Sequence, residues 1–315
     1  MQEPLRRTLA LTSLALLAVL AMRQPAMADL EDDWTLCNSK DADIAIAACS
    51  QITRRRPLEA WKLSDAYNQR GLAHAKKGDY DRAIADYDRA VYLNETSAWP
   101  YNNRGLAYAE KNDYERAMAD FAKAMELEEE NAWAYHNRGL VYAKQGDYDR
   151  AIADYTKCIE FDIDHVWAYS HRGLAYAAKR DYDRAIADFT TAIEHEPDYA
   201  WFHINRGVAF STKRLYPRAI ADFSRALELE AGNAWAYTNR GWAHLNAGKA
   251  ALGLADVEKA LVLAPDDANF LDARGHMLEA MGRKKLAIES FRQALAKDPS
   301  LKGSVAGLKR LKAGR

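Results

Sequence analysis

The dipeptide Arg-Gly recurs seven times in this chain of 315 residues, and every copy lies thirty-four positions after the one before it. No insertion or deletion interrupts the series, whose glycines are Gly71, Gly105, Gly139, Gly173, Gly207, Gly241 and Gly275. A fixed period in this range is typical of a solenoid, in which each unit buries its apolar face by stacking on its neighbours. We therefore expect a repeat protein whose function depends on what its surface binds.

Each glycine is surrounded by small and aromatic residues at constant offsets. Around Gly105, for example, Tyr101 comes four positions earlier, and Ala117, Phe121 and Ala124 follow on the C-terminal side. At 100° per residue, the residues near the glycine share one face of a helix, and the later group shares one face of a second helix. A turn of the type Gly-Asp-Tyr-Asp separates the two helices and supplies an N-capping aspartate. The pattern predicts pairs of closely packed helices.

This pattern resembles the tetratricopeptide repeat, and the resemblance covers about three quarters of the chain. It implies an all-α fold, a right-handed superhelical solenoid of helix-turn-helix repeats. We expect an N-terminal capping helical pair and linker over residues 29–63 and a basic C-terminal capping helix over residues 302–315. The expected repeats are 64–97, 98–131, 132–165, 166–199, 200–233, 234–267 and 268–301.

The C-terminal repeats depart from the pattern. Gly253 and Val257 replace the usual small and aromatic residues of the sixth repeat, and Leu271 replaces the tyrosine of the seventh, so this end is expected to pack more loosely or to serve as a cap. In the last segment, Val305, Leu308 and Leu311 have helical spacing and predict a helix that shields the final repeat.

The first 28 residues resemble a secretory signal peptide. Arg6 and Arg7 precede an apolar stretch over residues 8–22, and Ala26-Met27-Ala28 offers a cleavage site. An uncleaved membrane anchor is the alternative. Removal of this segment changes the net charge from −1 to −3, which is too small a charge to attract nucleic acid. We expect a bacterial protein that is periplasmic or secreted and has no membrane span after signal removal.

The cysteines agree with export. Cys37 and Cys49 lie close together in the segment before the first repeat, and both are expected to face a helix–helix contact. A disulfide between them would stabilise the fold by about 3 kcal/mol, and two buried free thiols are the alternative. Cys158 occupies an alanine position of the repeat core and is interpreted as a packing residue.

Two rows of side chains lie away from the face that packs on the second helix. Tryptophan stands six positions before the glycine in five repeats, and an amide or a histidine stands two positions before it. The resemblance implies that this side lines a concave groove for an extended peptide or a segment of a partner protein. Rings offer apolar area there, and amides offer both a donor and an acceptor. The candidate groove residues are Trp99, Trp133, Trp167, Trp201, Trp235, Asn103, Asn137, His171, Asn205 and Asn239.

A structural role is the alternative for both rows. Each tryptophan begins a helix and could pack on the preceding repeat, and the asparagines could be solvated on an open face.

A constant pairing of arginine with aspartate is expected to be structural as well. In six repeats an aspartate follows the glycine at a constant offset, as Asp120 follows Gly105. This spacing predicts a salt bridge to the arginine of the Arg-Gly pair rather than an anion site.

No catalytic centre is predicted. The eight histidines lack metal-ligand spacing, and no phosphate-binding loop or nucleophile elbow is present, so we expect neither a metal site nor a cofactor. The sequence predicts a non-catalytic protein–protein interaction scaffold of the cell envelope, with a protein or peptide as its partner. The alternative is a glycan-binding factor or one that assists polysaccharide secretion or envelope assembly, because aromatic and amide side chains also suit sugars. The ten basic residues between Arg283 and Arg315 are interpreted as solvated, with contact to anionic lipid or acidic polymer as the alternative.

Overall fold

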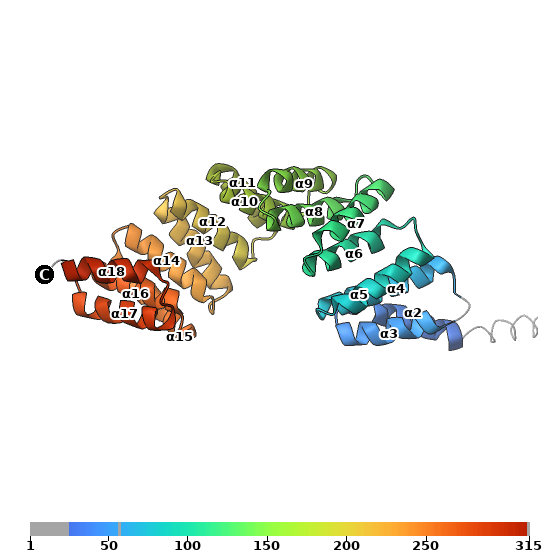
Figure 1. Cartoon of the computed structure of the whole chain (residues 1–315), viewed down its shortest axis with the longest axis horizontal. Coiled ribbons are helices and arrows are strands. Elements are labelled where there is room, and N and C mark those ends of the chain that lie inside the picture. The colour runs from blue at the N-terminus through green and yellow to red at the C-terminus, as the bar shows by residue number, and fades with distance from the viewer. Residues whose placement is uncertain (1–24, 56–57, 314–315) are drawn as a thin grey trace, which may run out of the picture. The chain divides into compact units, whose positions relative to one another are not determined.

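The computed structural model describes residues 25–55 and 58–313, and this part of the chain contains seventeen helices and no strand (Figure 1). The predicted all-α repeat fold is confirmed. The helices are α2 (Pro25–Cys37), α3 (Ala42–Arg54), α4 (Ala60–Lys76), α5 (Tyr80–Leu93), α6 (Ala98–Glu110), α7 (Tyr114–Leu127), α8 (Ala132–Lys144), α9 (Tyr148–Phe161), α10 (Val166–Ala178), α11 (Tyr182–His195), α12 (Ala200–Thr212), α13 (Tyr216–Leu229), α14 (Ala234–Asn246), α15 (Ala250–Leu263), α16 (Ala268–Ala280), α17 (Lys284–Lys297) and α18 (Lys302–Ala313).

The chain divides into two compact units, residues 1–141 and residues 142–315, and the boundary falls inside α8. In the first unit, α2 packs on α3, and the pairs α4–α5 and α6–α7 follow. In the second unit the pairs are α10–α11, α12–α13, α14–α15 and α16–α17, and α18 packs on the last of them. Each pair from α4–α5 onward is one helix-turn-helix repeat.

A contact between a glycine and an aromatic ring recurs in the repeat pairs. A Cβ atom added to Gly105 would lie 2.8 Å from a ring carbon of Phe121, and one added to Gly173 would lie 2.9 Å from the ring of Phe189. Both rings are fully buried. The missing Cβ therefore lets the ring of the second helix lie directly against the backbone of the first, and a full-size side chain has no space there.

The sixth repeat solves the same packing problem differently. Val257 is smaller than the usual ring, and Gly253 allows the second helix to approach the first more closely. A Cβ atom on Gly253 would lie 2.7 Å from the carbonyl oxygen of Gly241 and 2.8 Å from the sulfur of Met277. The expectation of looser packing in this repeat is therefore wrong.

The turns inside the repeats are capped as the sequence predicts. The side chains of Asp79, Asp113, Asp147 and Asp181 each accept a hydrogen bond from a backbone N–H of the helix that follows, at 3.1 to 3.2 Å. Gly78 and Gly146 have positive φ angles of 76° and 79° in these turns, a conformation that glycine adopts without steric cost.

A disulfide joins Cys37 of α2 to Cys49 of α3, which confirms the predicted pairing. Both cysteines are buried in a small cluster with Ile52 and Ala66, so the bond lies in the contact between the first helices. Cys158 is a buried free cysteine, and burial raises the pKa of its thiol to about 12. Its interpretation as a packing residue is confirmed.

The C-terminal helix α18 covers the last repeat with two of the three predicted apolar residues. Leu308 and Leu311 pack in the cluster that contains Phe291. Arg310 also donates two hydrogen bonds to the carboxylate of Glu279, at 2.9 and 2.7 Å. Val305 is 51% exposed, so its predicted part in the shielding contact is wrong.

The predicted signal segment, residues 1–28, lies outside the described residues except for its last four, which belong to α2. Within the described part of the chain, no helix has both the length and the apolar character needed to span a bilayer.

Replacing Gly173 with valine tests the glycine–ring contact. We expect the free energy of unfolding to fall by about 1–3 kcal/mol, because the Phe189 ring or the α10 backbone must shift. Urea denaturation followed by circular dichroism measures the change. Gly232→Ala is the control, since a Cβ at this exposed turn residue meets no atom within 4 Å, and it should change stability by less than about 0.5 kcal/mol. Equal effects of the two variants would contradict the packing argument.

Reduction of the Cys37–Cys49 bond should lower the free energy of unfolding by about 3 kcal/mol, because the reduced unfolded chain gains conformational freedom. Urea denaturation with and without a phosphine reductant measures this change. The Cys37→Ala/Cys49→Ala double variant serves as the control and should show no response to the reductant. A response of the same size in the double variant would show that the reductant acts elsewhere.

Candidate functional site

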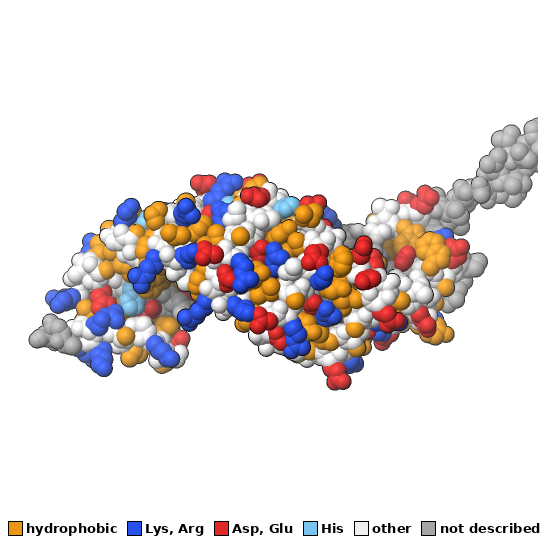
Figure 2. Space-filling model, turned by 90° about the horizontal axis from the view of Figure 1, so that it is seen from above, with side chains coloured by type: hydrophobic (Ala, Val, Ile, Leu, Met, Phe, Trp, Pro, Cys, Tyr) orange, Lys and Arg blue, Asp and Glu red, His pale blue; other side chains and the backbone are white. Residues whose placement is uncertain are grey.

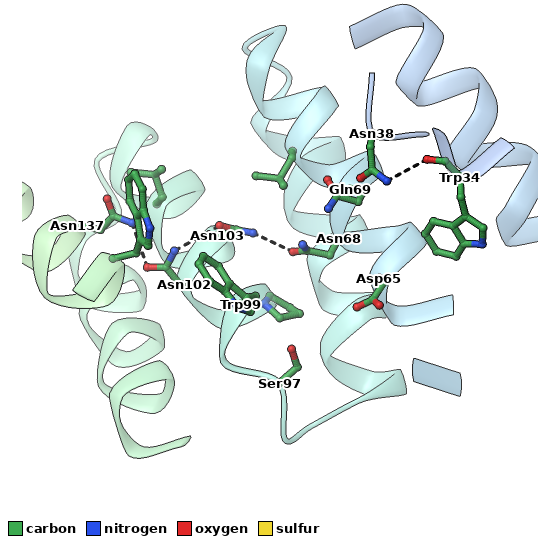
Figure 3. A pocket seen from close by; sticks show the side chains of 14 residues that line it. Trp34, Asn38, Asp65, Asn68, Gln69, Ser97, Trp99, Asn102, Asn103 and Asn137 are labelled. Carbon is green, nitrogen blue, oxygen red and sulfur yellow. Dashed lines mark hydrogen bonds between the residues drawn. The ribbon is translucent and has the colours of Figure 1, made fainter. Parts of the chain in front are cut away.

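A groove of about 760 Å³ lies along the first helices of the N-terminal unit (Figure 3). Its wall is formed by side chains of α2, α4, α6 and α8, together with residues that flank these helices. The lining residues are Trp34, Asn38, Asp65, Asn68, Gln69, Leu72, Ser97, Trp99, Pro100, Asn102, Asn103, Leu106, Trp133 and Asn137. Four of the ten predicted groove residues, two tryptophans and two asparagines, therefore lie together in one site.

The two predicted tryptophans of this groove are surface residues. Trp99 and Trp133 are each the second residue of their helix, and they are 47% and 43% exposed. Trp133 also meets the ring of His136 edge-on, with the centroids 6.0 Å apart. Because so much of each indole remains in water, these rings offer apolar area that a ligand could cover.

Side-chain amides are hydrogen-bonded to one another across the repeats. Asn137 donates to Asn102 at 3.0 Å, Asn102 donates to Asn103 at 3.3 Å, and Asn103 donates to Asn68 at 2.9 Å (Figure 3). We call these four residues the amide network. Asn102 and Asn137 are buried, whereas Asn103 is half-buried. The asparagines are therefore held in place by each other, which differs from the solvated row that was the alternative.

The sequence patterns did not reveal the amide network. The predicted row contains the amides two positions before each glycine, but their partners Asn68 and Asn102 stand three positions before it. Each inter-repeat bond joins residues 35 positions apart, one more than the repeat period. This offset depends on how far neighbouring helices are shifted along their axes, which the repeat period does not specify.

Three further lining residues were missed because they lie before or at the start of the first repeat. Trp34 precedes Asn68 by one full repeat period, and Asn38 precedes Leu72 by the same interval, so the period extended backward would have found both. Asn38 donates a hydrogen bond to the backbone oxygen of Trp34 at 2.9 Å. Asp65 precedes Trp99 by one period and occupies the tryptophan position of the first repeat.

The other six predicted groove residues belong to the second unit and lie outside this groove. Trp167 and His171 are on α10, Trp201 and Asn205 are on α12, and Trp235 and Asn239 are on α14. Asn68 and Asn102 of the amide network have no amide equivalents there. Three positions before the glycine, these repeats have Ser170, Ile204 and Thr238. The side-chain nitrogen of Asn205 is buried without a hydrogen-bond partner in the described structure.

Two tryptophans of the second unit pack on the repeat that follows. Trp167 meets the ring of Phe202 with centroids 5.6 Å apart, and Trp235 meets Phe270 at 5.3 Å. These ring contacts are made with the following repeat, whereas the alternative expected packing on the preceding one. Trp201 remains 49% exposed.

His171 is uncharged. Its ring lies close to that of Trp167, and burial lowers the pKa of the imidazole to about 4, so this imidazole is neutral at physiological pH.

The arginines of the Arg-Gly pairs form the predicted salt bridges. In the pairs named below, the arginine donates two hydrogen bonds to an aspartate of its own second helix, at 2.8 to 2.9 Å from Nε and 2.6 to 2.8 Å from Nη2. A third nitrogen reaches the preceding repeat; Arg206, for example, donates to Thr190 at 3.1 Å. The aspartates neutralise the row, which supports its structural role. The pairs are Arg70–Asp86, Arg104–Asp120, Arg172–Asp188, Arg206–Asp222 and Arg240–Asp256.

In the described residues, no three histidine, cysteine, aspartate or glutamate side chains converge as metal ligands would. The chemistry that the groove offers is non-covalent: exposed indole rings, amide edges held by their neighbours, two leucines and one carboxylate.

Stacked helix pairs with a groove along their first helices define a helical-repeat protein. Tetratricopeptide repeat models match residues 64–97, 132–165, 166–199 and 238–301, and a TPR repeat model matches residues 106–146. These matches cover more than half of the chain, which therefore belongs to the tetratricopeptide repeat family. No curated protein matches the sequence significantly.

Several solved structures share this fold. A chain of the APC/C hetero-tetramer Cut9–Hcn1 aligns with a TM-score of 0.64 and 20% identity over 91% of this chain, which spans 56% of that longer one. The C-terminal part of a TPR repeat-containing protein from Cytophaga hutchinsonii aligns at 0.60 and 22% identity, over 76% of this chain and 98% of that one. YrrB, a TPR protein, aligns at 0.52 and 24% identity, over 63% and 97%. At these identities the likeness shows the fold alone.

Replacing Asn102 with alanine tests the amide network. The donor of Asn137 would lose its acceptor in a buried site, so we expect the free energy of unfolding to fall by about 1–3 kcal/mol. Urea denaturation of the two proteins measures the difference. Asn239→Ala makes the same change where the network has no equivalent, and it should alter stability by less than about 0.5 kcal/mol. A loss of the same size in both variants would mean that the network contributes nothing specific.

Proposed function

We propose that this protein is a non-catalytic scaffold of the cell envelope that binds an extended segment of a partner protein in the groove of its N-terminal unit. The tetratricopeptide repeat fold is in general a protein–protein interaction scaffold. The finer proposal depends on one observation: exposed indole rings of Trp99 and Trp133 stand beside amides that are already fixed in orientation.

The groove suits an extended peptide in size and chemistry. Its volume of about 760 Å³ lies within the range of ligand sites and leaves room for several residues of an extended chain. The indoles can cover apolar side chains of the peptide, and the half-buried amides of Gln69 and Asn103, both in the groove lining, can pair with its backbone. Because the amide network holds Asn103 in place, binding orders few side chains, and this favours affinity.

Two further facts support the proposal. YrrB, with which this chain shares the fold, is described as a TPR protein with an unusual peptide-binding site, and the analogy raises the expectation of a peptide ligand here. For the compartment, the apolar N-terminal segment and the Cys37–Cys49 disulfide agree with an oxidising environment outside the cytoplasm.

Selection of random peptides displayed on phage against the full-length protein tests the binding proposal. We expect the selected peptides to bind the Trp99→Ala/Trp133→Ala variant at least tenfold more weakly than the parent. Truncation of an aromatic residue that is buried at an interface costs about 2 kcal/mol or more of binding free energy. Fluorescence anisotropy of labelled peptides measures the affinities.

The matched control is the Trp201→Ala/Trp235→Ala variant, which removes two exposed tryptophans at the same repeat position outside the groove. It should bind the selected peptides as the parent does, and both variants should retain the helical content of the parent. If the two variants bind equally well, the tryptophans of the groove are structural and the proposal fails. If no peptide is selected while an oligosaccharide array gives binding that depends on Trp99 and Trp133, the ligand is a glycan.

A further inference from the structure

The first repeat places a carboxylate where the next five repeats have an indole. Asp65 stands six positions before Gly71, the place that Trp99 and Trp133 occupy in the following two repeats. All three residues line the groove, so the row of side chains along its wall begins with a negative charge and continues with two rings.

This charge has no counter-ion in the part of the chain that the structure describes. Among these residues, no lysine, arginine or histidine forms a salt bridge with Asp65, and no donor hydrogen-bonds to its side chain. Asp65 is also the one charged residue in the described lining of the groove, whose other polar groups are neutral amides, one hydroxyl and the indole N–H groups. Much of the residue is exposed, but the groove wall withdraws the carboxyl group partly from water, and this desolvation raises its pKa. An unpaired, partly desolvated carboxylate gains more from a cation than a fully hydrated one does.

Aromatic rings flank this carboxylate. In Figure 3, Asp65 lies between Trp34 of α2 and Trp99 of α6, on the wall that these residues share. Indole has the most favourable ring face for cations, and a guanidinium group can stack on it while it pairs with a carboxylate through two parallel hydrogen bonds. Lysine can satisfy the charge but lacks the planar geometry that suits both partners at once.

We propose that the groove selects partner segments that carry a basic residue, preferentially arginine, whose guanidinium group pairs with Asp65 between Trp34 and Trp99. This inference rests on the proposed function and specifies the chemistry of its ligand. The basic residue fixes the register of the bound segment, because Asp65 is the one charge in the described lining and the rest of the groove, from Trp34 on one side of it to Trp133 on the other, is neutral.

The peptides selected on phage supply the probe. Those that lose binding to the Trp99→Ala/Trp133→Ala variant are kept as groove ligands, and each arginine in them is replaced in turn by citrulline, which is uncharged but nearly isosteric. We expect one citrulline replacement to weaken binding to the parent about tenfold, the effect of losing a close charge pair in a partly desolvated site. On Asp65→Asn the unmodified peptide should bind about tenfold more weakly than on the parent, and citrulline should cause no further loss.

Two control variants separate the local pair from other effects. Glu258→Gln removes one negative charge from an exposed residue of α15, outside the groove, and should leave all affinities unchanged. Asp65→Glu keeps the charge and should restore most of the preference for arginine over citrulline. Circular dichroism should show the same helical content in all variants.

The outcomes distinguish this inference from the function on which it rests. If groove-dependent peptides contain no enriched basic residue, or if citrulline costs as much on Asp65→Asn as on the parent, the pairing with Asp65 is wrong while peptide binding stands. If Glu258→Gln weakens binding as much as Asp65→Asn does, the effect is general electrostatics and the inference also fails. If no peptide depends on Trp99 and Trp133, both proposals fail.

Discussion

The contact on which this structure depends is the one between a glycine backbone and an aromatic ring of the partner helix. At Gly105 and Gly173 the missing Cβ leaves just enough space for a buried ring, so two helices can pack at close range. In the sixth repeat the two helices also lie close together, although Val257 is smaller than the usual ring. Gly253 stands where the other repeats have a larger residue, and this brings the helices closer. Both residues are smaller than those they replace, so the close packing is kept by a shorter distance between the two helices and by the sulfur of Met277, which would lie 2.8 Å from a Cβ atom on Gly253.

Close packing in each repeat determines which side chains reach the other surfaces. Because one face of the first helix is used by the glycine contact, residues such as Trp99 and Asn103 are directed to the opposite side, where they line the groove. The arginine beside each glycine lies at the edge of the contact. In the fifth repeat, for example, it pairs with an aspartate of the second helix while its third nitrogen reaches the preceding repeat. One dipeptide thus serves both the packing within a repeat and the connection between repeats.

The two units use equivalent positions for different purposes. In the N-terminal unit, asparagines three positions before the glycine complete the amide network and hold the groove wall in place. In the second unit, Ile204 and Thr238 occupy such positions, and Trp167 and Trp235 lie against rings of the following repeat. The sequence predicted one continuous row of binding residues. Similar residues at a constant spacing do not have a common environment, because each side chain also depends on its neighbour in the next repeat.

The sequence by itself determined what repeats within one helix pair: the helices, their caps, the glycine contacts and the arginine–aspartate pairs. It also placed Cys37 and Cys49 close enough to pair. These features follow from local spacing, since residues a few turns apart on two connected helices have little freedom in how they meet. Only the tertiary structure decided the features that join one repeat to the next. The amide network and the packing direction of Trp167 and Trp235 both depend on how far successive helices are shifted along their axes. That shift results from the packing of whole side-chain surfaces, and a constant repeat period carries no information about it.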